Sequence, residues 1–166
     1  GSDGKIGRNR MIELRIEQIE DKREKGRVAR RILEALPAWF AIPQAREQYI
    51  SDSENQLFLA ARRGEEAAGF LCLKETGRDT AEIAVMGVAP QYRRQGIGRE
   101  LVLAAQKAAL QQGYSFLQVK TVQMGRYPNY DETNLFYLSL GFQEFEVFPA
   151  LWDPQNPCQI YVMSLI

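Results

Sequence analysis

The sequence predicts a single α/β domain with helices on the faces of a mixed β-sheet of six to seven strands. A length of 166 residues suits one domain, and 45% hydrophobic with 25% charged residues suits a packed core. Segments in which apolar residues follow strand-type alternation also succeed segments in which they follow helix-type spacing. The predicted order is β-α-α-β-β-β-α-β-α-β-β, with about four helices and no internal repeat.

The N-terminal part begins with a strand and two helices. Apolar and charged residues alternate over residues 11–19, which predicts a half-buried strand. Apolar residues then recur at helical spacing from Asp21 until Pro37 stops the helix. Pro43 suits a first helical turn, so a second, short helix is expected to about Ser53.

Three strands follow in the middle of the chain. Residues 57–63 and 67–74 are apolar runs joined by Gly64, Glu65 and Glu66, which predicts a hairpin. The next strand covers residues 80–89 and stops at Pro90.

The C-terminal part predicts two helices and three strands. A long Ala- and Leu-rich helix closes at Gly113, and a strand covers residues 115–122. A loop over residues 123–131 leads to a helix from about Glu132 to Gly141. The last two strands are expected over residues 142–148 and 159–165, separated by a Pro-rich loop.

The charge balance disfavours nucleic acid and anionic membranes as partners. Lys plus Arg equals Asp plus Glu, at 21 each. The basic run Lys22, Arg23, Lys25, Arg27, Arg30 and Arg31 is interleaved with Glu20, Asp21, Glu24 and Glu34. We interpret this run as the solvated face of a helix.

Metal sites and His-based catalysis are disfavoured, because the chain has no His and two Cys without metal-ligand spacing. Cys72 lies in an apolar run and is expected in the core. No membrane span or signal peptide is visible, so a cytoplasmic protein is expected. Residues 1–10 begin Gly-Ser and resemble a cloning remnant, which makes Met11 the expected native start.

The junction between the strand ending near residue 89 and the long helix predicts an anion-binding loop. Gly96 and Gly98 allow close approach of the backbone, and the helix N-terminus offers unpaired N–H groups. Arg93, Arg94 and Arg99 add positive charge. The loop lacks the third glycine and acidic residue of a dinucleotide fold, and it lacks the Gly-Lys-Ser/Thr of a P-loop.

Two motifs resemble the GNAT superfamily of N-acetyltransferases. Arg93-Arg94-Gln95-Gly96-Ile97-Gly98 is similar to its signature loop, which follows a strand ending Val-x-Pro. Tyr137-Leu138-Ser139-Leu140-Gly141-Phe142 is similar to its Tyr-x-x-x-Gly-Phe. The resemblance covers nearly all of residues 11–166 and implies a single GNAT domain in which the fourth and fifth strands are parallel and splay apart.

The resemblance also implies acetyl-CoA as the acyl donor. The cofactor-binding residues that it implies are Met86, Gly87 and Val88 on the strand, and Arg93, Arg94, Gln95, Gly96, Ile97, Gly98 and Arg99 in the loop.

Two catalytic residues are implied as well. Glu82 is similar in position to the family's strand carboxylate, which takes the proton of the attacking amine, although it could also be a surface Glu. Tyr137 resembles the tyrosine that protonates the leaving thiolate, or it is a core aromatic. Many relatives place an Asn seven residues before this Tyr, where Tyr130 stands here, and Asn129, Tyr130 and Asn134 all remain candidates for a CoA contact.

The predicted function is transfer of an acetyl group from acetyl-CoA to a primary amine in a ternary complex. The alternative is an acyl-CoA-binding sensor without turnover, and a nucleic-acid-binding module ranks third. The acceptor is a small molecule or a peptide, and a homodimer is left open. Trp39, Phe40 and residues 149–157 with Trp152 and Asp153 are where the resemblance places acceptor contacts, with core packing as the alternative for the two tryptophans.

Overall fold

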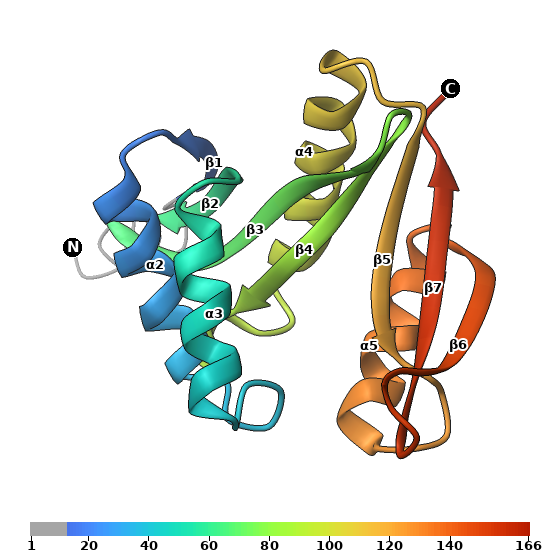
Figure 1. Ribbon diagram of the computed structural model, residues 1–166. Coiled ribbons are helices and arrows are strands. Elements are labelled where there is room, and N and C mark those ends of the chain that lie inside the picture. Colours follow the sequence, from blue (N-terminus) through green and yellow to red (C-terminus); the bar gives the residue numbers. More distant parts are fainter. Residues whose placement is uncertain (1–12) are drawn as a thin grey trace.

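The computed structural model describes residues 13–166 as one seven-stranded mixed sheet with helices on both faces (Figure 1). The strands are β1 (Leu14–Ile19), β2 (Leu57–Arg63), β3 (Glu66–Gly77), β4 (Thr80–Val88), β5 (Phe116–Val122), β6 (Gln143–Asp153) and β7 (Asn156–Ser164). The helices are α2 (Lys22–Glu34), α3 (Pro43–Ser53), α4 (Ile97–Gln111) and α5 (Pro128–Ser139), with a 3-10 turn η1 (Pro90–Tyr92). The predicted order of elements is confirmed. The part of the predicted first strand at residues 11 and 12 and the proposed start at Met11 lie outside the described residues.

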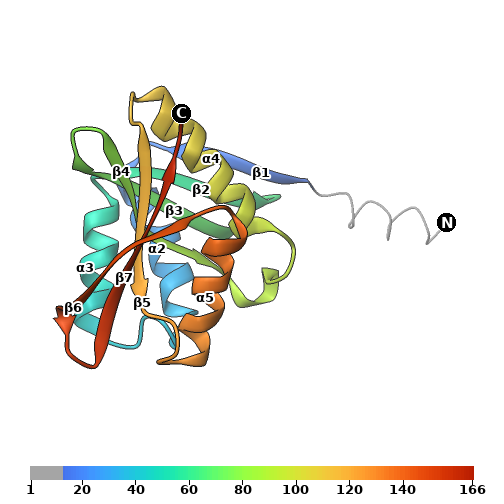
Figure 2. The ribbon, with the colours of Figure 1, turned by 90° about the vertical axis from the view of Figure 1, so that its right-hand side faces the viewer.

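Each face of the sheet has its own apolar core. Ile32 and Leu33 of α2 and Ile50 of α3 pack with strand residues such as Phe70 on one face. Leu101 and Val102 of α4 pack on the other face, together with Tyr137 of α5. Figure 2 shows α3 on one side of β5 and β7 and α5 on the other side. The sheet therefore separates two helical layers, each of which packs on its own apolar core.

The sheet is split between β4 and β5, as predicted. These two strands run parallel and are paired only from Thr80 and Phe116 to Ile83 and Val119. The strand order is β1-β2-β3-β4-β5-β7-β6, so the split lies inside the sheet rather than at its edge. Figure 1 shows β4 and β5 diverging beyond their paired ends. We call the point after Ile83 and Val119 the fork.

The structure differs from the prediction at the start of α5 and in the region that joins β6 to β7. Helix α5 begins at Pro128 instead of near residue 132, because Pro128 occupies the first helical turn, where a missing N–H costs nothing. The expected loop over residues 149–157 is also wrong. Strand β6 runs to Asp153 and β7 starts at Asn156, and the Asp153 carboxylate accepts hydrogen bonds from the N–H groups of Gln155 and Asn156 at 2.9 and 3.0 Å.

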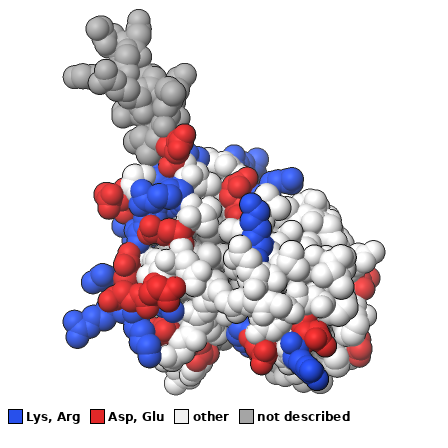
Figure 3. All heavy atoms as spheres, turned by 90° about the horizontal axis from the view of Figure 1, so that it is seen from above, with Lys and Arg blue, Asp and Glu red and all other residues white. Residues whose placement is uncertain are grey.

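Two members of the basic run on α2, Arg30 and Arg31, are paired with acidic side chains. Arg30 donates two hydrogen bonds to Glu47 at 2.6 and 2.7 Å, and Arg31 contacts Glu66 at 2.6 Å. Figure 3 shows acidic and basic side chains mixed on the face that it displays. The prediction of a solvated face is wrong for Lys25, which is 7% exposed and donates to the Gln56 carbonyl at 2.7 Å. Lys25 therefore provides a hydrogen-bond donor for a backbone carbonyl in the segment that follows α3.

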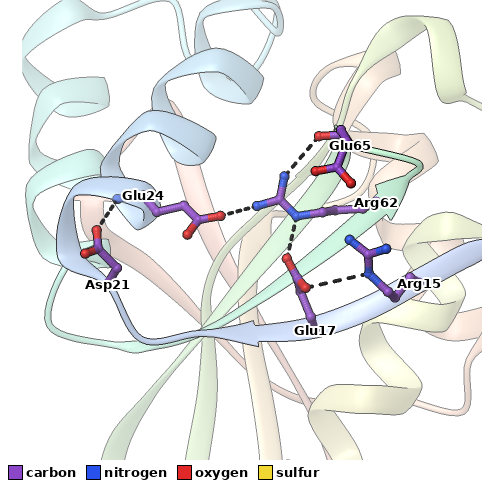
Figure 4. A network of polar contacts seen from close by, with 6 residues as sticks. All are labelled: Arg15, Glu17, Asp21, Glu24, Arg62 and Glu65. Carbon is purple, nitrogen blue, oxygen red and sulfur yellow. Dashed lines mark hydrogen bonds and ion pairs between the residues drawn. The ribbon is translucent and has the colours of Figure 1, made fainter.

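Arg62 of β2 forms hydrogen bonds with β1, with α2 and with the turn between β2 and β3 (Figure 4). Its Nε donates to Glu17 of β1 at 2.5 Å, a second nitrogen donates to Glu24 of α2, and a third donates to the Glu65 carbonyl at 3.3 Å. The Glu24 N–H in turn donates to Asp21, the cap of α2, at 2.9 Å. A guanidinium that is 9% exposed needs these partners, since an unpaired buried charge is costly.

Candidate active site

The loop between η1 and α4 has the geometry of an anion-binding nest. Arg94 and Gly96 both have left-handed backbone conformations, with φ of 61° and 77°. Within residues 13–166, no hydrogen bond is recorded from the backbone N–H groups of residues 94–99, and the first such bond of α4 is from Glu100 to the Gly96 carbonyl at 3.1 Å. Unpaired N–H groups at a helix N-terminus attract phosphate.

The two glycines of this loop have different roles. Gly96 caps α4 in a left-handed conformation, which is strained for a residue with a side chain. A Cβ added at Gly96 would have no atom within 4 Å, so space is not the constraint there. A Cβ on Gly98 would lie 3.1 Å from the Phe136 ring of α5. Gly98 therefore allows α4 and α5 to approach each other, and a substitution there would disturb packing as well as any ligand.

The side chains of the loop point to different partners. The Arg93 guanidinium lies 5.1 Å from the centre of the Trp39 ring, and the Gln95 side-chain oxygen Oε1 accepts a hydrogen bond from Arg63 at 3.4 Å. Ile97 is 1% exposed and belongs to the core, so only its backbone could contact a ligand. Arg94 and Arg99 are exposed.

Strand β4 offers an open edge beyond the fork. Met86, Gly87 and Val88 pair with β3, but their other edge is not paired with β5. The β3–β4 register shifts between Ile83 and Val85, which leaves Ala84 as the extra residue of a bulge. Backbone groups on this open edge are available to a ligand that runs along the strand.

Glu82 is buried on the α2–α3 side of the sheet, next to the fork. Its neighbours Ala81 and Ile83 both belong to the core under α4, so strand alternation turns Glu82 to the opposite face. The residue is 4% exposed, and its Oε1 accepts a hydrogen bond from Gln118 at 2.6 Å. The alternative of a surface glutamate is therefore wrong.

Two lysines also contact the Glu82 carboxylate. Lys120 Nζ lies 3.1 Å from Oε1, and Lys74 Nζ lies 3.5 Å from Oε2. Neither lysine nor Gln118 belongs to a sequence motif. Pairing of Lys74 and Gln118 with Glu82 across the strands brings them together, and this register is visible only in the structure.

Tyr137 lies on the other side of the sheet. It is 5% exposed and packs against Phe136, Phe142 and Tyr161, with ring centres 5.3, 5.4 and 6.3 Å away. No hydrogen bond of its hydroxyl is recorded among the described residues, and burial raises its pKa above the ordinary value. The phenol therefore keeps its proton.

Asn134 does not have free groups for a cofactor. Its amide donates to the carbonyls of Val122 and Tyr130 at 2.8 and 2.7 Å, and its oxygen accepts from the Tyr161 hydroxyl at 2.6 Å. Asn129 donates to the Ala38 carbonyl at 3.2 Å, which links α5 to the loop after α2. Of the three CoA-contact candidates, Tyr130 is the one whose side chain makes no recorded hydrogen bond within residues 13–166.

Several aromatic side chains lie on the α2–α3 side of the sheet, the side that also carries Glu82. Phe40 and Tyr49 are in edge contact at 5.7 Å, and burial, followed by the negative charge of Glu82, raises the pKa of Tyr49. Trp39 is half-buried against the α2–α3 core. Core packing is wrong for Trp152, which is 47% exposed on β6.

No group of three or more His, Cys, Asp or Glu residues in the described part of the chain could hold a metal ion. None of the helices in residues 13–166 has the length and apolar character to cross a membrane.

Comparison with known proteins gives the family. The chain matches the model of the Acetyltransferase (GNAT) family over residues 19–142, and it therefore belongs to the GNAT family of acetyltransferases. It is 33% identical to N-acetyltransferase 8B of Rattus norvegicus over 115 residues, which is 64% of this chain. The chain spans about half of that relative's length, 48%.

Solved structures share the fold. A GNAT-family protein from Desulfovibrio desulfuricans has a TM-score of 0.83 at 19% identity, covering 93% of this chain and 100% of that one. A candidate acetyltransferase from Salmonella typhimurium, solved with its cofactor acetyl-CoA, has a TM-score of 0.70 at 14% identity, covering 92% of this chain and 94% of that one.

Proposed function

We propose that this protein transfers the acetyl group of acetyl-CoA directly to a primary amine bound beside Glu82. The observation that carries the proposal is the placement of Glu82 and Tyr137 on opposite faces of a sheet that is split between β4 and β5. Donor and acceptor can then approach the reacting carbonyl from different sides. Family membership and the names of the relatives support acetyl transfer to nitrogen.

The cofactor site is proposed to combine the loop and the open edge of β4. The N–H groups of residues 94–99 would bind the pyrophosphate, with Arg94 and Arg99 adding charge. The pantetheine arm would hydrogen-bond to the free edge at Met86, Gly87 and Val88. The acetyl group would then lie near the fork, because the arm runs from the end of β4 toward its middle.

Glu82, beside the fork, and Tyr137, on the opposite face of the sheet, would move the required protons. An ammonium group must lose a proton before its nitrogen attacks the thioester, and the Glu82 carboxylate can accept it directly or through water. The nitrogen then bonds to the carbonyl carbon while the carbon–sulfur bond breaks. Tyr137, which keeps its proton, donates to the departing thiolate and regains a proton from the reaction. The products are an amide, the free CoA thiol and one proton.

A covalent acyl-enzyme on the thiol of Cys158, which lies on β7, is disfavoured. Cys158 is fully buried, and burial raises its pKa to about 11, so the thiol is protonated at neutral pH. A protonated thiol is a poor nucleophile. This supports direct transfer to the amine.

The test is CoA thiol release from acetyl-CoA, measured with a panel of primary amines in wild type and in Glu82→Gln. We expect Glu82→Gln to lose about 10²–10⁴ in turnover with little change in acetyl-CoA affinity, since it removes the base and keeps the shape. Glu75→Gln is the matched control, because Glu75 is an exposed carboxylate on the neighbouring strand β3. Wild-type turnover in Glu82→Gln would remove Glu82 from the mechanism. CoA binding without amine-dependent thiol release would favour the sensor.

A further inference from the structure

Lys120 lies at the point where β5 leaves β4. The last paired residues of the two strands are Ile83 and Val119, and Lys120 is the first residue of β5 beyond them. It stays in the sheet by pairing with Ile160 of β7 on its other side. Its side chain shares a face with Gln118, two residues earlier, and its Nζ lies 3.1 Å from Glu82 Oε1. This places a primary amine at the fork, in contact with the proposed base.

The proposed cofactor site would direct the acyl end of the donor to the same place. A pyrophosphate on residues 94–99 lies beyond the C-terminal end of β4, and a pantetheine arm on residues 86–88 runs back along the strand toward Ala84 and Ile83. The edge of β4 that is free of β5 ends at Ile83, so the arm cannot pair beyond the fork. The thioester is thus directed at the position next to Lys120.

We propose that Lys120 is a self-acetylation site, at which the protein transfers an acetyl group to its own side chain when no external acceptor is bound. This inference depends on the proposed function. Glu82 takes a proton from the Lys120 ammonium, Nζ bonds to the acetyl carbon, the carbon–sulfur bond breaks, and a proton reaches the thiolate through Tyr137. The lysine ammonium and acetyl-CoA become N-acetyl-lysine, the CoA thiol and one proton.

The modification has a consequence for the acceptor site. Acetylation removes the charge of Lys120 and its contact with Glu82, leaving Lys74 and Gln118 as the recorded partners of the carboxylate. The added acetyl group would occupy the space beside Glu82 that an external amine needs. Self-acetylation would therefore compete with turnover when the acceptor is scarce.

Lys74 and Lys107 are internal controls for this chemistry. Lys74 also contacts Glu82, at 3.5 Å, but it lies on β3, across β4 from the fork. Lys107 lies exposed on α4, where direct chemical acetylation by acetyl-CoA is not hindered. An enzyme-catalysed reaction favours Lys120 over both, whereas a chemical side reaction favours the more exposed lysines.

The experiment is incubation of the full chain with acetyl-CoA alone, followed by peptide mass spectrometry over time. We expect Lys120 to be acetylated at least about tenfold faster than Lys107, because proximity replaces a bimolecular encounter. The rate constant should not change with protein concentration. Glu82→Gln and the loop variant Gly96→Val should each slow labelling of Lys120 and leave Lys107 unchanged, and Lys120→Arg should remove the label at that position.

The outcomes separate this inference from the function on which it depends. Labelling of Lys120 no faster than Lys107, in protein that releases CoA thiol with an external amine, overturns self-acetylation and leaves the proposed function standing. A rate constant that rises in proportion to protein concentration also overturns it, since the transfer is then between molecules. Failure of both self-labelling and amine-dependent thiol release overturns both proposals.

Discussion

Glu82 and Tyr137 are both buried, but their surroundings suit opposite tasks. The Glu82 carboxylate contacts one amide and two ammonium groups, which makes its site polar and adapted to a positive partner. Tyr137 is surrounded by aromatic rings and has no recorded hydrogen bond among the described residues. In the proposed mechanism the Glu82 carboxylate accepts a proton on one face and the Tyr137 phenol donates one on the other.

Tyr137→Phe tests the phenol directly. The substitution keeps the ring and its packing, so the free energy of unfolding should change little, whereas turnover should fall about 10²-fold or more. Acetyl-CoA affinity should fall less than the rate, because the interaction strengthens only as charge develops on sulfur. Since burial raises the Tyr137 pKa, this group should cause no loss of rate up to about pH 10, the ordinary value for tyrosine.

The measurements are steady-state kinetics with an accepted amine and a CoA binding curve for both proteins. Equal turnover in Tyr137→Phe and wild type would assign Tyr137 to packing alone.

Sequence motifs locate these two residues, but not the groups around them. Glu82 and Tyr137 can be found because they stand at fixed distances from the loop and from Gly141-Phe142. Gln118 and Lys120 are more than thirty positions from Glu82 along the chain and meet it only through the parallel register of β4 and β5. The alternation of side chains along a strand predicts that Gln118 and Lys120 share one face of β5. It does not predict that β4, which carries Glu82, is the neighbouring strand.

At the scale of elements, the loop before α4 combines backbone strain with unpaired donors. Arg94 holds a left-handed conformation that disfavours residues with a side chain, and Gly96 holds a second one two residues later. Such conformations aim successive N–H groups at one point. The loop is therefore more sensitive to substitution than its exposure suggests.

Gly96→Val and Gly113→Val separate strain from ligand binding. The two glycines flank α4, both have positive φ, of 77° and 92°, and neither has an atom within 4 Å of an added Cβ. Each substitution should lower the free energy of unfolding by about 1–2 kcal/mol. We expect only Gly96→Val to weaken CoA binding, by about tenfold or more, which corresponds to about 1.4 kcal/mol.

Calorimetry of CoA binding and denaturant unfolding of both variants provide the measurements. Unchanged CoA affinity in folded Gly96→Val would contradict the assignment of the pyrophosphate to this loop. Gly98 is less suited to the test, because a Cβ there would contact Phe136.

Proline residues explain why the sequence-based prediction is wrong about the start of α5 and the end of β6. Pro128 and Pro149 both resemble loop residues in the sequence, yet Pro128 lies in the first turn of α5 and Pro149 lies within β6. Proline is tolerated in both places, since β6 is an edge strand of the sheet and a first helical turn needs no N–H donor. Local sequence cannot distinguish these cases from true loops.

At the scale of the whole molecule, the split sheet with a separate core on each face defines the proposed mechanism. The α2–α3 side carries Glu82 and the aromatic residues near it, and the α4–α5 side carries Tyr137. Pairing of β4 with β5 ends at Ile83 and Val119, so beyond these residues no hydrogen bonds between the two strands separate the two faces. In the proposed mechanism donor and acceptor are bound together, and no acyl-enzyme forms between them.

The initial-rate pattern of acetyl transfer tests this claim most directly. Thiol release is measured while acetyl-CoA is varied at several fixed concentrations of an accepted amine, in the Lys120→Arg background to exclude self-acetylation. Simultaneous binding predicts double-reciprocal lines that intersect. Parallel lines, the kinetic signature of a covalent acyl-enzyme, would contradict direct transfer.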